Sequence, residues 1–322
     1  MSLLEVKDLK TYFFTRRGVV KAVDGVSFSL EKGKTLGLVG ESGCGKSITC
    51  LSIMRLISPP GRIIGGKILL DGEDILSLSE KEMQRVRGKR VSIILQDPMS
   101  SLNPAFSVGD QVGEAIRKHQ GTQGTALREK NIEMLKLVRV SSPEVRIDQY
   151  PHQFSGGMRQ RVVGAIALSC QPRVLIADEP TTSLDVTIQL QYLKLLKDIQ
   201  QKSQLGVIFI THDFGVAARV CDTVAVMYAG KIVEVASIVE FFANPLHPYT
   251  QALMGSVCKP GQKVERLYSI EGQPPRLDEL PPGCSFAPRC QYVYDKCRRD
   301  PAPTLAMIHK EHSARCWKLE QP

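Results

Sequence analysis

The pattern of hydrophobic positions divides the chain into short strands and helices. Apolar and polar residues alternate over residues 3–30, in segments such as LLEVKDLKTYFF and KAVDGVSFSL, which is typical of antiparallel strands. A fully apolar run, TLGLVG, follows at residues 35–40 and leads into the helical stretch SITCLSIMRLI at residues 47–57. A buried strand that feeds a helix is the opening unit of a parallel α/β sheet.

Further apolar segments continue this sheet. A second alternating piece, GGKILLDGEDI, precedes the first of them, and apolar spacings of three and four between residues 98 and 150 indicate helices. Strands that alternate with helices, such as IQLQYLKLLKDIQQ, predict a parallel sheet with an antiparallel β subdomain and a helical insertion. The predicted buried strands are Val91–Asp97, Val174–Asp178, Val207–Asp213 and Thr223–Tyr228.

The composition changes after about residue 243. Prolines at turn-forming positions appear in PGQ, GQPP, LPPG and DPAPT, and the tail is poor in strand patterns. We expect one domain over residues 1–245, with a helical subdomain at about 97–162. A small Pro- and Cys-rich extension over residues 246–322 is expected to follow it.

Composition and charge are those of a globular protein. An apolar content of 43% and a charged content of 23% argue against disorder or a fibre. No apolar run approaches the roughly 18 residues of a membrane span, and the N-terminus lacks the features of a signal peptide, so we expect a cytoplasmic chain. The net charge of +9 fits a nucleic-acid partner, an anionic membrane or simple solubility; dispersed Lys and Arg residues favour solubility.

The segment GESGCGKS fits the phosphate-binding loop G-x-x-x-x-G-K-[ST], between a strand and a helix as that function requires. Its glycines let backbone N–H groups converge on phosphate oxygens at a helix N-terminus. Lys46 is suited to the β- and γ-phosphates, and the Ser47 hydroxyl to Mg²⁺. This context disfavours a mere tight glycine turn. The residues predicted to bind ATP here are Gly40, Ser42, Gly43, Gly45, Lys46, Ser47 and Ile48.

The segment VLIADEP supplies a second part of a nucleotide site. Its apolar residues carry Asp178 to the carboxyl end of a strand, where open sheets bind ligands. Asp178 is expected to hold Mg²⁺ through water, and Glu179 to orient and deprotonate the attacking water. Such a pair alone is as often a solvated strand end, but beside a phosphate loop it predicts ATP hydrolysis.

The segment FSGGM, followed by the helical RQRVVGAIAL, resembles the signature of the ATP-binding cassette (ABC) ATPases, although it departs from LSGGQ at both ends. Ser155, Gly156 and Gly157 offer hydroxyl and backbone donors at a helix start, which makes a second anion cradle. In the family this cradle covers the ATP of the opposite subunit. The resemblance therefore implies a head-to-tail dimer with two ATP molecules, and the intact anion-binding positions imply ATPase activity.

Other positions match the same family in order over about residues 3–245. Gln96 matches the Q-loop, which touches Mg²⁺ and senses the membrane partner, and Asp185 belongs to the D-loop segment SLD. His212 in ITHD matches the switch histidine, which contacts the γ-phosphate and positions the water beside the catalytic carboxylate. A lone Gln or His of this kind would be an ordinary surface or structural residue; the other motifs select these two.

An aromatic side chain near the N-terminus is expected to stack on adenine. Phe13, or else Tyr12, matches the family at this position. Aromatic residues in strand patterns are usually core residues, which is the alternative reading of both.

Four of the nine cysteines cluster in the C-terminal tail. A reducing cytoplasm disfavours disulfides, and a metal centre would cross-link a tail with little apolar core. Four thiolates suit either zinc or an iron–sulfur cluster. Because no C-x-x-C pair occurs, a [4Fe–4S] cluster is favoured over zinc, with uncoordinated thiols third. The four residues are Cys284, Cys290, Cys297 and Cys316.

The tail also resembles a particular branch of the family. NPLHPYTQAL and GCSFAPRCQYVYDKC are similar to the C-terminal extension of the oligopeptide/dipeptide importer ATPases, whose HPY stretch appears as His247, Pro248 and Tyr249. Some members carry an iron–sulfur cluster there, and FSGGMRQR is their usual signature. The resemblance implies an ATP-hydrolysing, energy-coupling subunit of a di- or oligopeptide importer.

The same resemblance implies the partners. They are a second ABC ATPase subunit, expected to be a homologue, two integral membrane permeases and, indirectly, an extracytoplasmic solute-binding protein. The chain would lie at the cytoplasmic face of the membrane, and no nucleic acid is expected. A nickel or other small-solute importer is the nearest alternative, followed by a soluble ABC ATPase acting on ribosomes or nucleic acid. Nucleotide binding without turnover is disfavoured by the intact motifs.

Overall fold

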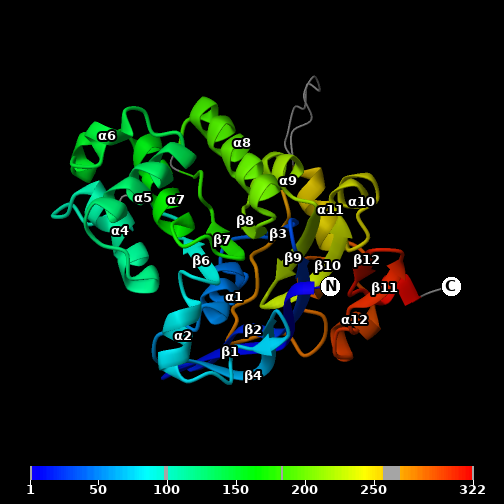
Figure 1. The fold of residues 1–322 in the computed structure, drawn as a ribbon. Helices are drawn as coiled ribbons and strands as arrows, with labels where there is room; N and C mark the ends of the chain where they lie inside the picture. The colour runs from blue at the N-terminus through cyan, green and yellow to red at the C-terminus, as the bar shows by residue number, and fades with distance from the viewer. Residues whose placement is uncertain (1, 98–100, 183, 257–268, 321–322) are drawn as a thin grey trace. The chain divides into compact units, whose positions relative to one another are not determined.

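The computed structural model describes residues 2–97, 101–182, 184–256 and 269–320. Its contacts divide the chain into two compact units, and each unit is built from segments that are far apart in the sequence (Figure 1). Among the described residues, no helix is long and apolar enough to cross a membrane. The first unit contains Met1–Leu4, Leu30–Thr35 and Leu70–Ile210, and the second contains Glu5–Ser29, Leu36–Leu69 and Thr211–Pro322.

Three parallel buried strands form the core of the first unit. β7 lies between β6 and β8 and pairs with both of them in parallel. Their sequences, VSII, VLIAD and GVIFI, are almost continuously apolar, as expected for strands that are covered on both faces. The bounds are Val91–Ile94 for β6, Val174–Asp178 for β7 and Gly206–Ile210 for β8.

Two of these strands are shorter than predicted. The segment 91–97 was expected to be a strand throughout, and β6 ends at Ile94; the segment 207–213 was expected likewise, and β8 ends at Ile210. β6 ends opposite Ala177, and β8 ends opposite Asp178, the last residue of the central strand β7. The residues that follow β6 and β8 therefore lie in loops, where the functional candidates of both segments are found.

The helices of the first unit include the helical stretch predicted between residues 98 and 150. α4, α5 and α7 pack against one another. In α4, Val108, Val112 and Ile116 recur every four residues and are buried, while Ser107 caps the first turn and Gly121 ends the helix at φ 67°. The bounds, together with the short strand β5 (Glu73–Asp74), are Glu80–Val86 (α2), Val108–Gln120 (α4), Gly124–Leu137 (α5), Pro143–Arg146 (α6), Pro151–Gln153 (η1), Gly156–Leu168 (α7) and Val186–Ser203 (α8).

A second run of strands forms the core of the second unit, in the order β3, β9, β10, β12, β11. β3 and β9 are parallel, and the later pairs are antiparallel. The tail, which was expected to be poor in strands, contributes two short ones, and β12 continues the sheet from the edge of β10. The bounds are Thr35–Val39 (β3), Thr223–Tyr228 (β9), Lys231–Ser237 (β10), Ala306–His309 (β11) and His312–Ala314 (β12).

A hairpin and several short helices complete the second unit. β1 and β2 are neighbours joined by two residues, so they run antiparallel as predicted, and β4 lies on the other side of β1. The helix expected over residues 47–57 is shorter, because Arg55 adopts φ 51° and the N–H of Leu56 bonds back to the carbonyl of Leu51. The bounds are Ser2–Thr15 (β1), Gly18–Glu31 (β2), Gly61–Leu70 (β4), Lys46–Ile53 (α1), Phe214–Val220 (α9), Ile238–Ala243 (α10), Pro248–Gly255 (α11), Ala287–Arg289 (η2), Asp295–Arg299 (α12) and Trp317–Glu320 (η3).

Candidate nucleotide site and cysteine cavity

The phosphate loop in the second unit joins β3 to α1, and close backbone approaches require glycine at two of its positions. Gly40 has φ 148°, and a Cβ there would lie 2.3 Å from the carbonyl oxygen of Met227. Gly45 has φ 111°, and its Cβ would lie 2.3 Å from the carbonyl oxygen of Ala22. Any side chain at either position would displace the backbone of a neighbouring strand. The backbone of the neighbouring strands therefore fixes the conformation of the phosphate loop at these two glycines.

Within this loop the candidate phosphate ligands differ in exposure. Lys46 is buried at 6% exposure, and its ammonium donates to the carbonyl oxygens of Gly40 at 2.8 Å and Glu41 at 2.9 Å. Ser42, Gly43 and Ser47 are exposed, and Ile48 is half-buried. Ser47 lies in the first turn of α1, where the helix dipole favours an anion such as a phosphate group.

The carboxylate pair of the first unit lies at the end of β7. Asp178 is the last residue of the strand and is 6% exposed. Glu179 adopts the left-handed conformation at φ 45°, and its N–H donates to the carbonyl of Ile210 at 3.1 Å. A non-glycine residue in this conformation is strained, and such strain is typical of functional positions. The change of backbone conformation therefore comes between Asp178, which ends β7, and Glu179, which begins the turn.

One residue from another loop and one from the same turn donate hydrogen bonds to the carboxylate of Glu179. The side-chain amide of Gln96, beyond β6, donates to Glu179 Oε2 at 3.1 Å. The hydroxyl of Thr182 donates to the same oxygen, also at 3.1 Å. Sequence motifs selected Gln96 and Glu179, but not Thr182, whose only signal was its place three residues after the glutamate. The pair of donors orients the carboxylate that we expect to act as the base.

The signature turn and the D-loop meet at one cavity of about 460 Å³ in the first unit. Ser155 caps α7 through its hydroxyl, and Asp185 caps α8 by accepting from the N–H of Ile188 at 3.0 Å. Gly156 and Gly157 also line the cavity, as does Arg161, which motif reasoning missed. Two helix N-termini and a guanidinium at one opening suit an anion. Ser183 of the D-loop lies outside the described residues.

His212 belongs to the second unit. It is exposed and directly precedes Asp213, whose carboxylate caps α9. On its other side, the N–H of Thr211 donates to the carbonyl of Leu38 in β3 at 3.4 Å. The histidine is therefore held next to the strand that leads into the phosphate loop.

The two candidate adenine-stacking residues have different environments. The Tyr12 hydroxyl donates to Asp24 at 2.6 Å, and burial together with this hydrogen bond raises the pKa of the phenol. The Phe13 ring packs against Gly61, where a Cβ would lie 2.6 Å from the ring. These contacts occupy the Tyr12 hydroxyl and one side of the Phe13 ring. The choice between the two stays a prediction.

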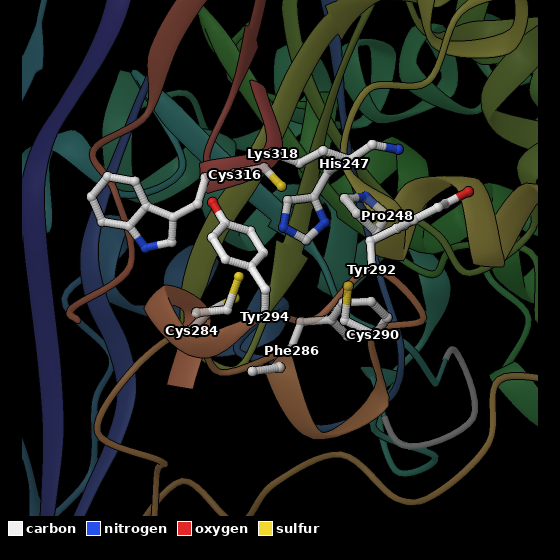
Figure 2. A pocket seen from close by; sticks show the side chains of 12 residues that line it. His247, Pro248, Cys284, Phe286, Cys290, Tyr292, Tyr294, Cys316 and Lys318 are labelled. Carbon is white, nitrogen blue, oxygen red and sulfur yellow. The ribbon is translucent and has the colours of Figure 1, made fainter. Parts of the chain in front are cut away.

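The four clustered cysteines line one small cavity of about 20 Å³ in the second unit, and all four thiols are free and half-buried. Figure 2 labels Cys284, Cys290 and Cys316 around the cavity, with the rings of His247 and Tyr294 among them. Burial raises the pKa of the Cys284 and Cys290 thiols, and that of Cys316 to about 11. Among the described residues, no group of three or more His, Cys, Asp or Glu side chains has the arrangement that holds a metal ion.

Comparison with known proteins agrees with these motifs. Residues 23–182 match the family model described as ABC transporter, and residues 233–297 match the oligopeptide/dipeptide transporter C-terminal region. The chain is 50% identical to the dipeptide transport ATP-binding protein DppD of Bacillus subtilis, over 99% of this chain and 95% of the relative. This chain belongs to the ABC transporter ATP-binding family. It is also 44% identical to DppD of Escherichia coli, over 98% of this chain and 96% of that protein.

Solved structures confirm the ABC ATPase fold. The dimeric cassette MJ0796, in a post-hydrolysis state with ADP and Pi, has a TM-score of 0.66 at 23% identity and covers 73% of this chain and 98% of its own. The structure of cbiO1 from Clostridium perfringens has a TM-score of 0.64 at 27% identity, covering 76% and 91%. The predicted α/β P-loop fold of the ABC ATPases is thus confirmed. The boundary predicted at residues 245 and 246 stays a prediction.

Proposed function

We propose that this ABC ATPase is the energy-coupling subunit of a membrane importer for di- or oligopeptides. The single observation that carries the proposal is the full-length similarity to proteins named for dipeptide and oligopeptide transport, DppD and OppD of Bacillus subtilis, each at 50% identity. The site supports the ATP-hydrolysing half of it, since a phosphate loop and an oriented carboxylate are both present. Peptide specificity is supported by these relatives and by the match of residues 233–297 to the oligopeptide/dipeptide transporter C-terminal region.

The chemistry follows from the side chains. The Lys46 ammonium and the loop N–H groups would bind the phosphates, and Mg²⁺ would be held through Ser47, Gln96 and Asp178, hard oxygen donors of the kind it prefers. Bound Mg²⁺ would neutralise charge on the phosphates. The buried carboxylate of Asp178 at a strand end and the exposed hydroxyl of Ser47 fit that role.

Hydrolysis would depend on a base and on a switch residue. Glu179, held by Gln96 and Thr182, would accept the proton of the attacking water. His212 would contact the γ-phosphate. The Ser155 turn and Asp185 would cover the nucleotide of a second ABC subunit, and the cavity that they share supports an anion there.

The proposed assembly contains a second ABC ATPase, expected to be a homologue, and two membrane permeases. An extracytoplasmic solute-binding protein would act through the permeases, and the chain would lie at the cytoplasmic face of the membrane. The dimeric state of the similar cassette MJ0796 supports pairing of such folds. No nucleic-acid partner is proposed.

The cysteine cavity would hold a [4Fe–4S] cluster, with zinc as the alternative. The four thiols at one cavity match the number of donors that such a cluster requires, and this number supports the proposal, whereas their arrangement in this structure is not that of a metal site. Anaerobic purification followed by iron, acid-labile sulfide and zinc analysis tests it. About four irons and four sulfides per chain are expected, and these are lost on Cys290→Ser but not on Cys170→Ser, a buried cysteine of the other unit. Stoichiometric zinc without sulfide would refute the cluster.

The decisive test of the catalytic role is Glu179→Gln in the full chain. Phosphate release should fall on the order of 1,000-fold, because the amide cannot act as a base, while ATP binding is retained. Glu133→Gln, an exposed change on α5, should hydrolyse ATP like the parent. A Glu179→Gln chain that hydrolyses ATP as fast as the parent would refute the assignment.

Transport is tested separately, on the complex that co-purifies with this chain. Integral membrane proteins are expected in it, and vesicles that contain the complex should take up a labelled di- or oligopeptide when ATP is present. Uptake of Ni²⁺ in place of peptides would favour the nickel importer. ATPase stimulation by RNA or DNA, without membrane partners, would contradict the importer.

A further inference from the structure

The second residue of the phosphate loop is held by the C-terminal part of the chain. The Glu41 carboxylate receives two parallel hydrogen bonds from the guanidinium of Arg289, at 2.7 and 3.0 Å. Such a fork is the strongest geometry for an ion pair. The Arg289 side chain is 4% exposed and that of Glu41 27%, so this is not a solvated surface pair. The bond to Glu41 raises the pKa of the guanidinium.

The backbone of Glu41 is held as well. Its N–H donates to the hydroxyl of Tyr249 at 2.9 Å, and its carbonyl accepts from the Lys46 ammonium at 2.9 Å. Tyr249 belongs to α11 and is fully buried, with its ring 4.6 Å from that of Tyr228. The side chain, N–H and carbonyl of one loop residue are thus all engaged, two of them by residues that come more than 200 positions later in the chain.

Arg289 is itself fixed by several contacts. It is the last residue of η2, and its guanidinium also donates to the Tyr228 hydroxyl at 3.3 Å and to the carbonyl of Glu271 at 3.1 Å. A side chain bound at three places has little freedom left, so the position of the carboxylate that it grips is determined by the C-terminal region. Neither Arg289 nor Tyr249 belongs to a nucleotide motif.

We propose that Arg289 and Tyr249 are positioning residues for the phosphate loop, which fix Glu41 and neutralise its charge so that the loop accepts MgATP. This inference rests on the proposed ATP-binding function. An unpaired carboxylate next to the phosphates would repel them, and an unheld N–H would leave the loop free to rearrange. The ion pair with Arg289 neutralises the charge that would repel the phosphates. The hydroxyl of Tyr249 accepts a hydrogen bond from the N–H of Glu41 and so restrains the loop.

The test is a steady-state measurement of KM for MgATP and of kcat on the full chain. Arg289→Gln should raise KM about tenfold with kcat little changed, because the loss lies in phosphate binding rather than in the base. Glu41→Gln added to Arg289→Gln should restore KM towards the parent value, since the repelling charge is gone. Arg299→Gln, on exposed α12 in the same unit, is the matched control and should behave like the parent.

Two further variants keep the inference testable if Arg289→Gln folds poorly. Arg289→Lys keeps the charge without the fork and should give an intermediate KM. Tyr249→Phe removes one hydroxyl while keeping the ring and should raise KM by a smaller factor than Arg289→Gln. If KM for MgATP is unchanged in Arg289→Gln and Tyr249→Phe, or if Glu41→Gln does not restore KM, this inference is wrong while the proposed function still stands. A parent chain that neither binds nor hydrolyses MgATP overturns the proposed function as well.

Discussion

The side-chain amide of Gln96 donates a hydrogen bond to the carboxylate of Glu179, although the two residues are 83 positions apart. The contact exists because β6 and β7 pair in parallel, with Ile94 opposite Ala177, so the loops that follow them leave the sheet at the same edge. A residue proposed to sense the membrane partner therefore touches the residue proposed to activate water.

The substitution Gln96→Glu tests this contact, because the two side chains have almost the same size and shape. Two adjacent carboxylates compete for one proton, so the base is protonated over a wider pH range and the acid limb of the pH–rate profile should move upward by about one unit. The measurement is kcat for ATP against pH. Gln201→Glu, an exposed change on α8, should leave the profile in place. Coincident profiles for Gln96→Glu and the parent would mean that the contact has no role in catalysis.

Two neighbouring glycines of the signature turn, Gly156 and Gly157, differ in the space that surrounds them. A Cβ on Gly156 meets no atom within 4 Å, whereas a Cβ on Gly157 would lie 2.6 Å from Ile188 of α8. Gly156→Ala should therefore melt like the parent or slightly higher, and Gly157→Ala should lose about 1–3 kcal/mol of stability.

The same pair tests the proposed nucleotide sandwich. If the turn covers a nucleotide of a second subunit, Gly156→Ala should lower ATPase activity about tenfold in spite of its intact fold. Thermal melting and phosphate release of both variants are the measurements. Full activity of Gly156→Ala would argue against close contact between this turn and any nucleotide.

A buried carboxylate ties the C-terminal region to β10. Glu234 is fully buried, accepts from the N–H groups of Leu246 and His247 at 2.8 Å each, and pairs with His312 of β12 at 2.8 Å. Glu234→Ala would leave these partners without an acceptor in the interior and should cost about 3–5 kcal/mol. Denaturant unfolding measures the loss; the exposed Glu240→Ala is the control. A loss below about 1 kcal/mol would contradict this role.

Burial of His247 predicts a dependence of stability on pH. Burial lowers the pKa of this imidazole from 6.5 to about 3, so between these values the unfolded chain binds a proton that the folded chain does not. Stability should therefore fall as the pH falls below about 6.5, by about 1.4 kcal/mol per pH unit from this group. Denaturant unfolding near pH 7 and near pH 5 measures the slope.

His247→Asn isolates this contribution. Asparagine does not titrate and is a good N-cap, so it can replace the ring nitrogen that accepts from the N–H of Tyr249 at 3.0 Å. The pH slope of the variant should be smaller than that of the parent by about 1–2 kcal/mol over this interval. Equal slopes would show that the histidine takes up its proton in the folded state.

The residues of the nucleotide motifs were predictable because their chemistry is local. A phosphate loop needs Gly40, Gly45 and Lys46 within eight consecutive positions, and the apolar run before Asp178 predicted the strand that carries it. The same local reasoning failed where strands end. β6 ends at Ile94 although the apolar run of the sequence continues to Leu95, and the prolines of the tail gave no sign that β12 pairs with the edge of β10.

The contacts between distant residues required the tertiary structure. The contacts of His312 with Glu234 and of Arg289 with Glu41 join residues whose side-chain types are common and whose spacing follows no period. Local chemistry indicates which groups we propose to bind phosphate and activate water, since consecutive residues form those turns. Packing alone selects which distant charges meet, because sheet register and burial bring together side chains that are separated by up to 248 positions.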